Sequence, residues 1–268
     1  MARKTAAQFN TKGAKVLLYG ATGSRKTSNI LYWADKNLPN WGIGIVTQEL
    51  AGLKALQVLG APMNEIPCED IAPRKGDSAL DLLCNGITGL AKEADVKAIL
   101  VDNITKSMQH YVAEMIREAG DAGKLTFNHW GKLNSSFQKL NDAIETAVNV
   151  NGKHVIVTAL EQEPVYKQVT KSNGEVTEVF MRSGGPFIKG NNWSWLPADF
   201  HLVARLYAGE ERMAAGKKEF KAGMFIRSKM THDGKEVEWV AKSRVSPAIP
   251  SELPHQDTYK LLMEEPQQ

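Results

Sequence analysis

The sequence predicts an α/β fold in which helices flank a mostly parallel central sheet, followed by an antiparallel C-terminal extension. Four short apolar runs without polar alternation, at residues 16–19, 43–46, 98–101 and 154–157, are separated by segments with helical periodicity. Strands buried on both faces lack alternation, and strands that alternate with helices pair in parallel. After Glu161, polar and apolar residues alternate around Asn173-Gly174, which is typical of an antiparallel hairpin.

Helices are predicted over residues 26–36 and 78–94, and over a long region between the third and fourth strands. Residues 201–206, 223–229 and 237–241 are expected to form further strands, which we predict to be antiparallel. The domain organisation that we expect is an N-terminal arm at 1–13, one core domain at 14–250 and a peripheral, Pro- and Glu-rich tail at 251–268.

The composition is that of an ordinary globular chain. Its 268 residues suffice for a sizeable core, and the hydrophobic fraction is 43% and the charged fraction 24%. No apolar run approaches the roughly 20 residues that cross a bilayer, and no signal-peptide pattern follows the basic N-terminus. The two cysteines, Cys68 and Cys84, have no metal-ligand spacing and fit a reducing compartment. We therefore expect a cytoplasmic protein without membrane contact, and the net charge of +3 decides nothing about nucleic acid.

The main functional motif joins the first strand to the first helix. It consists of Gly20, Ala21, Thr22, Gly23, Ser24, Arg25, Lys26, Thr27 and Ser28. In such a loop successive N–H groups point at phosphate oxygens, and the helix N-terminus adds positive potential. Lys26 would reach the β- and γ-phosphates and the Thr27 hydroxyl would ligate magnesium, so the motif predicts ATP and Mg²⁺ as cofactors. The alternative is a glycine-rich turn without a ligand.

Arg25 departs from this motif, which has glycine at that position. If the backbone there needs a positive φ, a non-glycine residue costs about 1–2 kcal/mol. The arginine could also project over the nucleotide or crowd it. We therefore expect ATP hydrolysis to be slow.

Two acidic residues follow predicted strands at the carboxyl edge of the sheet, where ligands gather. Asp102 ends the third strand and would orient magnesium, although it could instead cap the next helix, a role that Asn103 or Thr105 could also fill. Glu49 follows the second strand and would polarise the attacking water. The equally weighted alternative for Glu49 is an acid at a helix N-terminus.

Two further candidates lie towards the C-terminus. Thr158, at the end of the fourth strand, could sense the γ-phosphate, although a strand hydroxyl is more often structural. Lys242 and Arg244, at i and i+2 on a predicted strand, face the same side and could converge on one anion. The alternative for this pair is a solvated basic strand edge.

The order of these motifs resembles the ATPase core of RecA-type recombinases. More closely, the chain resembles the compact phage RecA-like ATPases associated with single-strand annealing, to which the segments 129–134, 155–159 and 196–200 are similar. The resemblance covers roughly residues 14 to 250. It implies a RecA-like P-loop NTPase core in which Lys26 and Thr27 hold phosphate and magnesium, Asp102 is the magnesium-associated acid and Glu49 the catalytic base.

The resemblance also implies an assembly. Lys242 and Arg244 would reach nucleotide bound to the neighbouring subunit of a homo-oligomer, a filament or ring with ATP at its interfaces. A single-strand-binding or annealing protein is a further implied partner, and the cytoplasm of a bacterial host cell the implied location. The sequence departs from the family at Ala159 and Leu160, where relatives tend to carry His or Gln for sensing the γ-phosphate.

Single-stranded DNA is the partner expected for the long segment after Glu161. Basic side chains can follow a phosphate backbone, and tryptophans can stack on bases of any sequence. The candidates there are Lys167, Lys171, Arg182, Lys189, Trp193 and Trp195. The alternative is a solvated hairpin with the two tryptophans packed beneath it.

The leading hypothesis is an ATP-dependent, DNA-associated RecA-like ATPase that acts in phage recombination or single-strand annealing. One alternative is a nucleotide-gated structural or loading protein with little hydrolysis, which Arg25 favours. Another is a small-molecule P-loop kinase, although no compact arginine-rich lid is evident and only Arg205 and Arg212 could serve.

Overall fold

The computed structural model describes residues 13–49, 53–74, 77–120, 124–172, 174–214, 217–225, 229–232, 235–238, 240–243 and 252–254. Strands and helices alternate through the first part of the chain, as the sequence predicts. They are β1 (Lys15–Gly20), α1 (Lys26–Asn37), the 3₁₀ turn η2 (Pro39–Trp41), β2 (Ile43–Thr47), α2 (Lys54–Val58), β3 (Cys68–Asp70), α3 (Ala79–Ala91), β4 (Ala98–Asp102), α4 (Ile104–Glu118), α5 (Phe127–Glu145), the π-helical turn η5 (Thr146–Val150) and β5 (His154–Gln162).

The second part consists mostly of strands. They are β6 (Val165–Thr170), β7 (Val176–Arg182), β8 (Gly185–Pro186), β9 (Leu202–Ala214), β10 (Lys217–Phe225), β11 (Lys229–His232), β12 (Lys235–Glu238), β13 (Lys242–Ser243) and β14 (Glu252–Pro254), with the helix α6 (Asn192–Asp199) between β8 and β9. Most of the predicted tail, residues 251–268, and nearly all of the arm, 1–13, lie outside the described residues.

The main sheet has the order β14-β10-β9-β1-β5-β4-β2-β3, with β8 and β13 added on β5 and β9. The pairs from β9 through β3 are parallel, and those of β10 with β9 and β14 are antiparallel. The predicted mostly parallel α/β sheet is thus confirmed. The antiparallel strands β10 and β14 lie beyond β9 at one end of the sheet, and the short strands β8 and β13 pair antiparallel with β5 and β9.

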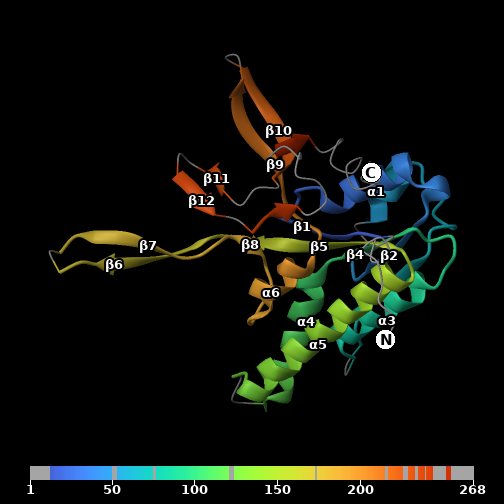
Figure 1. The fold of residues 1–268 in the computed structure, drawn as a ribbon, viewed down its shortest axis with the longest axis horizontal. Helices are drawn as coiled ribbons and strands as arrows, with labels where there is room; N and C mark the ends of the chain where they lie inside the picture. The colour runs from blue at the N-terminus through green and yellow to red at the C-terminus, as the bar shows by residue number, and fades with distance from the viewer. Residues whose placement is uncertain are drawn as a thin grey trace, which may run out of the picture.

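Both faces of the central strands β1, β2, β4 and β5 are covered, which explains the absence of alternation in their sequences. On one face alternate residues such as Leu17, Val157 and Val203 pack against α3, α4 and α5. On the other face the intervening residues, such as Leu18 and Ile156, pack against α1 and α2. Figure 1 shows these two helical layers on opposite sides of the strands.

The prediction that residues 201–206 form an antiparallel strand holds for only one edge of that strand. This segment begins β9, which pairs in parallel with β1 from Val16↔Leu202 to Tyr19↔Arg205. The reason is α6, because a helical crossover returns the chain to the same edge and leaves the next strand parallel. On its other edge β9 pairs antiparallel, with β13 at Leu202 and Val203 and with β10 from Arg205 onward.

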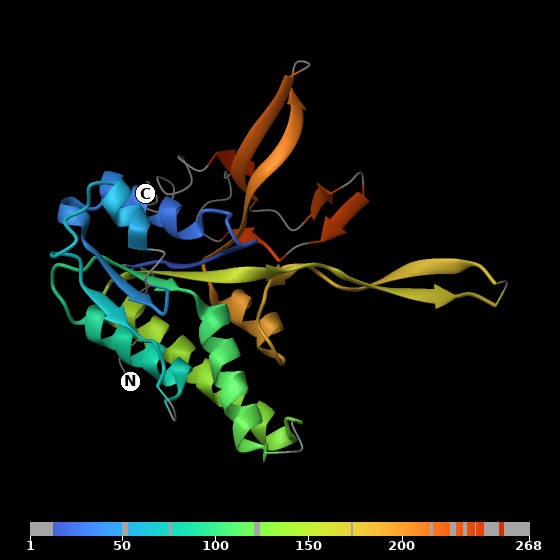
Figure 2. The same cartoon turned by 180° about the vertical axis from the view of Figure 1, so that it is seen from behind.

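The Asn173-Gly174 hairpin is confirmed as the antiparallel pair β6–β7. All residues of β6 are exposed, and β6 and β7 pair only with each other among the described strands. Figures 1 and 2 show this hairpin projecting well beyond the helices and the main sheet. We refer to β6 and β7 together as the hairpin. No helix in the described part of the chain is long and apolar enough to span a membrane.

Two glycines of α3 test the packing of this helix on the sheet. A Cβ added at Gly86 would lie 2.8 Å from Val46 Cγ1, whereas one added at Gly89 would meet nothing within 4 Å. We expect Gly89→Ala to raise the free energy of unfolding by about 1 kcal/mol, because alanine favours helix. In Gly86→Ala, overpacking by about 1–3 kcal/mol should cancel or reverse that gain. Urea denaturation measures both, and equal effects would contradict the packing of α3 against β2.

Candidate nucleotide-binding site

The loop between β1 and α1 needs glycine at two positions. A Cβ added at Gly20 would lie 2.2 Å from the carbonyl oxygen of Leu206 and 2.7 Å from Ser24 Oγ. Gly23 has φ +83°, in the left-handed region. The loop therefore lies directly against the backbone of β9, and its curvature depends on residues without a side chain.

Arg25 lies at a position that favours glycine. Its φ is 60° and its ψ 29°, and it is the N-cap of α1 without a side-chain capping bond. This confirms the backbone requirement inferred from the motif. An L-residue in this conformation costs roughly 1–2 kcal/mol, so the loop holds local strain beside the predicted phosphate site.

Lys26 points back into the loop that precedes it. Its side chain is buried, and Nζ donates to the carbonyl oxygens of Gly20 and Ala21, both at 2.9 Å, and to Ser24 Oγ at 3.3 Å. Burial lowers the pKa of Lys26, while the charges of Asp102, then Glu161 and Glu49, act in the opposite direction. A buried ammonium held only by neutral oxygens is poised to receive an anionic ligand.

Asp102 connects the loop to three strands. Its Oδ2 accepts from the Thr27 hydroxyl at 2.7 Å and its Oδ1 from the Thr158 hydroxyl at 2.6 Å. The Thr47 hydroxyl donates to its main-chain oxygen at 2.7 Å. Asn103 caps α4 by accepting from the N–H of Lys106, so Asp102 is not the cap.

The residue types at this point fit a magnesium ion. A threonine hydroxyl and a carboxylate oxygen in direct contact are hard oxygen ligands, which Mg²⁺ prefers. Thr27 is in the first turn of α1, immediately after Lys26, so a metal there would lie beside a phosphate held by the loop.

Glu49 lies beyond β2 and is held by α4. Lys106 Nζ lies 2.6 Å from Glu49 Oε1, and Asn103 Nδ2 donates to the same oxygen at 3.4 Å. Residues 50–52, on which the alternative of a helix opened by Glu49 depends, lie outside the described residues, and the described helix α2 begins at Lys54. The sequence did not identify Lys106 as its partner, although its place one turn after Asp102 was a usable signal.

A second ion pair lies at the end of β5. Arg205 Nε donates to Glu161 Oε2 at 2.9 Å, and both side chains are largely buried. Arg205 stands in an otherwise apolar part of β9, next to Tyr19 of β1 in the sheet. A charge inside an apolar strand was the sequence signal for this pair, but its partner is far away in the chain.

The other predicted nucleotide contacts are not brought together by the described residues. Thr158 is fully buried and is held on Asp102, so it positions this acid rather than opening onto the loop. Lys242 lies in β13, paired with Val203 of β9, and its side chain is not among those described. Arg244 lies outside the described residues.

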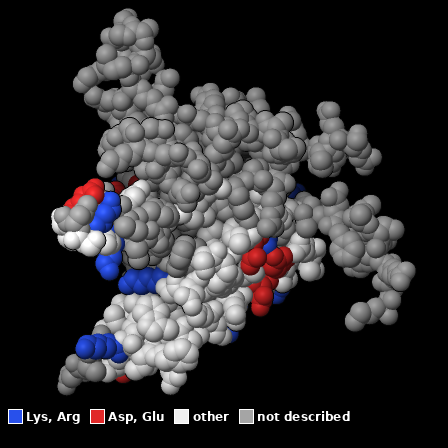
Figure 3. Space-filling view, turned by 60° about the vertical axis from the view of Figure 1, so that its left-hand side comes forward, with Lys and Arg blue, Asp and Glu red and all other residues white. Residues whose placement is uncertain are grey.

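The predicted DNA contacts separate into two groups. Lys167 is in β6, and Lys171, at the turn, forms an exposed ion pair with Glu175 at 3.1 Å. Arg182 ends β7, but its side chain is not described. Figure 3, which turns the left-hand side of Figure 1 forward, shows basic side chains and one acidic group at the left margin and a separate acidic cluster on the body. Lys167, Lys171 and Arg182 are thus the predicted DNA contacts that belong to the hairpin.

The second group lies in or near α6, a helix that the sequence did not predict. Trp195 packs against the core and its indole N–H donates to Asn192 Oδ1 at 3.1 Å. The N–H of Lys189 bonds to Met108 Sδ at 3.0 Å. Trp193 is in the same helix, with its side chain outside those described. The helix was missed because Pro197 lies within it.

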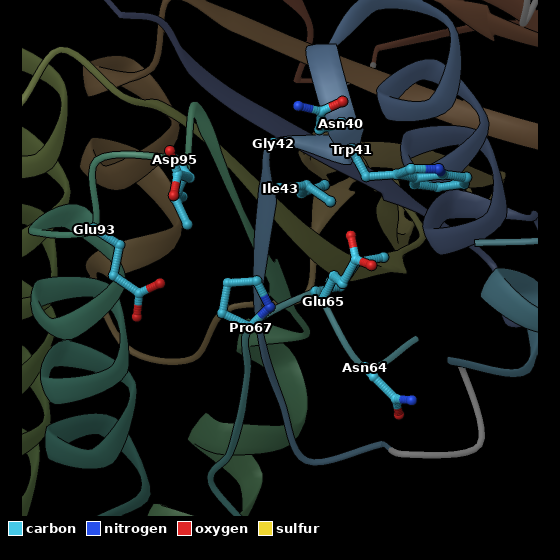
Figure 4. A pocket seen from close by; sticks show the side chains of 11 residues that line it. Asn40, Trp41, Gly42, Ile43, Asn64, Glu65, Pro67, Glu93 and Asp95 are labelled. Carbon is cyan, nitrogen blue, oxygen red and sulfur yellow. The ribbon is translucent and has the colours of Figure 1, made fainter. Parts of the chain in front are cut away.

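A cavity of about 310 Å³ lies at the opposite edge of the sheet, around the start of β2. Its lining includes Trp41, Glu65, Glu93 and Asp95 (Figure 4). None of the predicted site residues lines it, so we do not assign it to the nucleotide.

Comparisons with known proteins agree with the loop geometry. Residues 12–245 match the model of a family described as AAA domain. The chain belongs to this family. As an AAA-domain protein it is a P-loop ATPase by family. No curated protein matches it. Among solved structures the AAA-domain chain is similar to the RadB recombinase, at 14% identity and a TM-score of 0.43, over 79% of this chain and 88% of that one. The family assignment rests on the match over residues 12–245, with which the loop between β1 and α1 agrees.

The strain at Arg25 can be measured. We expect Arg25→Gly to raise the free energy of unfolding by up to about 1 kcal/mol, because glycine adopts φ 60° without the side-chain clash but gains entropy in the unfolded chain. Arg25→Ala removes the charge and keeps the strain, so it should give no such gain. Thermal unfolding of both variants measures the difference. If alanine stabilises as much as glycine, the charge and not the backbone is responsible.

Proposed function

We propose that this AAA-domain protein is an ATP-dependent, single-stranded-DNA-associated, RecA-like ATPase that acts in phage DNA recombination or single-strand annealing. The observation that supports it most is the contact of Thr27 with Asp102 beside the buried Lys26. These three side chains supply a cation, a hydroxyl and a carboxylate at one helix N-terminus. That set is what a magnesium-bound triphosphate requires.

In this proposal the residues have separate roles. The N–H groups of residues 21–27 and the Lys26 ammonium bind the phosphates, and Thr27 and Asp102 hold Mg²⁺. Thr158 and Thr47 orient Asp102 from β5 and β2. Bound magnesium neutralises developing phosphate charge.

Glu49 is the proposed general base, and its carboxylate must be free to accept a proton from water before it can act. Its carboxylate is engaged by Lys106 in the present structure. Until that ion pair opens, Glu49 is a poor acceptor for a proton from water, since its negative charge is already compensated. This observation, together with the strain at Arg25, favours slow basal hydrolysis and keeps a nucleotide-gated loading protein as the second candidate.

The kinase alternative has lost one of its candidate residues. Arg205, which could have belonged to an arginine lid, is largely buried in its pair with Glu161. A lid arginine must instead be free to close over phosphates.

DNA binding and assembly complete the proposal. The exposed hairpin with Lys167 and Lys171 would follow a single strand, and Lys242 and Arg244 would reach nucleotide on the next subunit of a filament or ring. The RadB recombinase, by its name, is a recombination protein, which agrees with this role. We leave Trp195 out of the proposed DNA surface because it packs against the core.

Replacing Lys26 tests the nucleotide part of the proposal. We expect Lys26→Ala to weaken ATP binding about 10- to 100-fold, since hydrogen bonds to a charged group contribute about 1.5–3 kcal/mol. ATP-stimulated binding to single-stranded DNA should be lost with it. Lys36→Ala, an exposed lysine on the same helix, is the matched control. Unchanged ATP affinity in Lys26→Ala, measured by calorimetry, would refute the assignment of the loop.

Replacing Lys167 tests the DNA part. We expect Lys167→Ala to weaken binding to single strands of any sequence and to reduce the slope of log K against log salt by about 0.7, the value for one lost phosphate contact. Lys139→Ala, on α5, should leave both quantities unchanged. Fluorescence anisotropy at several salt concentrations supplies the numbers. An unaltered slope in Lys167→Ala would remove the hairpin from the DNA site.

A further inference from the structure

Thr105 connects α4 to the two ends of the hairpin segment, at Leu160 and Phe187, which we call the feet of the hairpin. Its side chain is fully buried at the start of that helix. The hydroxyl accepts from the N–H of Leu160 at 3.0 Å and donates to the carbonyl oxygen of Phe187 at 3.1 Å. Phe187 N–H in turn donates to Leu160 oxygen at 2.7 Å. One hydroxyl thus bridges the strand that enters the hairpin and the segment that leaves it.

These feet are the hairpin's attachment to the main sheet. Leu160 is followed by Glu161 and Gln162, which pair with β8, and the chain then runs out through β6 and returns through β7. Neither β6 nor β7 pairs with another described strand. A force that acts on the projecting hairpin (Figure 2) therefore reaches the main sheet through its feet.

The same turn of α4 holds Glu49. Lys106, the residue after Thr105, forms the ion pair with Glu49. Asn103 caps the turn and also donates to Glu49 Oε1. Ser107 Oγ donates to Asn103 oxygen at 3.3 Å and accepts from Gln48 Nε2 at 2.8 Å, which ties the turn to the residue before Glu49.

We propose that the first turn of α4 couples the hairpin to Glu49, and that Thr105 is the positioning residue of this coupling. The proposal rests on the proposed function, in which single-stranded DNA binds the hairpin and Glu49 is the base. Single-stranded DNA bound to the hairpin displaces the feet of the hairpin. The Thr105 hydroxyl transmits that displacement to the first turn of α4. Lys106 and Asn103 move with the turn, because they belong to the same rigid helical segment, and release Glu49 for catalysis.

A purely structural role for Thr105 makes a different prediction. A buried hydroxyl that only stabilises the fold would affect every activity of the protein alike when removed. A coupling role affects the ratio of the DNA-stimulated to the basal ATPase rate and leaves the affinity for DNA unchanged. This ratio therefore separates the two roles.

The test compares Thr105→Val, which keeps the shape and loses the hydroxyl, with Thr105→Ser, which keeps the hydroxyl. Steady-state ATPase rates are measured with and without saturating oligo-dT, beside oligo-dT affinity by anisotropy. We expect wild-type stimulation of about fivefold or more, the lower end of typical couplings between sites. Thr105→Ser should retain that ratio. Thr105→Val should have a ratio near one, with the basal rate and the affinity kept.

Each other outcome has a defined meaning. Stimulation of Thr105→Val at the wild-type ratio, or an equal loss of basal and stimulated rates, overturns the coupling and leaves the proposed function standing. Absence of any response to oligo-dT in the wild type overturns the DNA part of the proposed function, and the coupling with it. If Thr105→Val does not fold, Lys106→Met replaces it, and a retained wild-type ratio in that variant overturns the proposal.

Discussion

The Asp102 carboxylate is the point on which the candidate site depends. It accepts one hydroxyl from α1 and one from β5, while Thr47 of β2 holds its main chain. A buried carboxylate is costly unless its oxygens are hydrogen-bonded, so these hydroxyls both fix its orientation and offset its desolvation. Through Thr27 the same bonds fix the start of α1 and hence the loop that precedes it.

Around this carboxylate the structure places strained and unbalanced groups close together. Arg25 adopts a backbone conformation that favours glycine, and Lys26 is a buried cation held by carbonyl oxygens. Such features lower stability, and they persist at functional sites where a ligand compensates for them. Glu49 is the converse case, because Lys106 already compensates its charge in the structure. In the proposed site, Lys26 is thus poised for an anionic ligand, whereas Glu49, the proposed base, is restrained by its ion pair.

Local sequence patterns were sufficient for the parts of the fold that depend on local rules. The apolar runs located β1, β2, β4 and β5, and the loop motif located the start of α1. The direction of β9 was not predictable in this way, because it depends on the crossover through α6, which Pro197 concealed. For Trp195 the sequence left open a DNA-contacting and a packed position, and in the structure its side chain packs against the core. Asp102 was predictable as a strand-end acid, but its contact with Thr158 follows from the pairing of β4 with β5. The Arg205–Glu161 pair and the clasp of Thr105 on Leu160 and Phe187 required tertiary structure, since each joins residues distant in the chain.

A crystal structure with Mg²⁺ and a slowly hydrolysed ATP analogue would examine the assignment of the loop most directly. We expect the triphosphate to be enclosed by the main-chain N–H groups between Gly20 and Thr27, with Lys26 Nζ turned from the Gly20 and Ala21 oxygens onto phosphate. The metal should lie at the Thr27 hydroxyl, beside Asp102. If the analogue binds elsewhere, or the loop keeps its internal Lys26 bonds at saturating nucleotide, this chain does not use the loop for ATP.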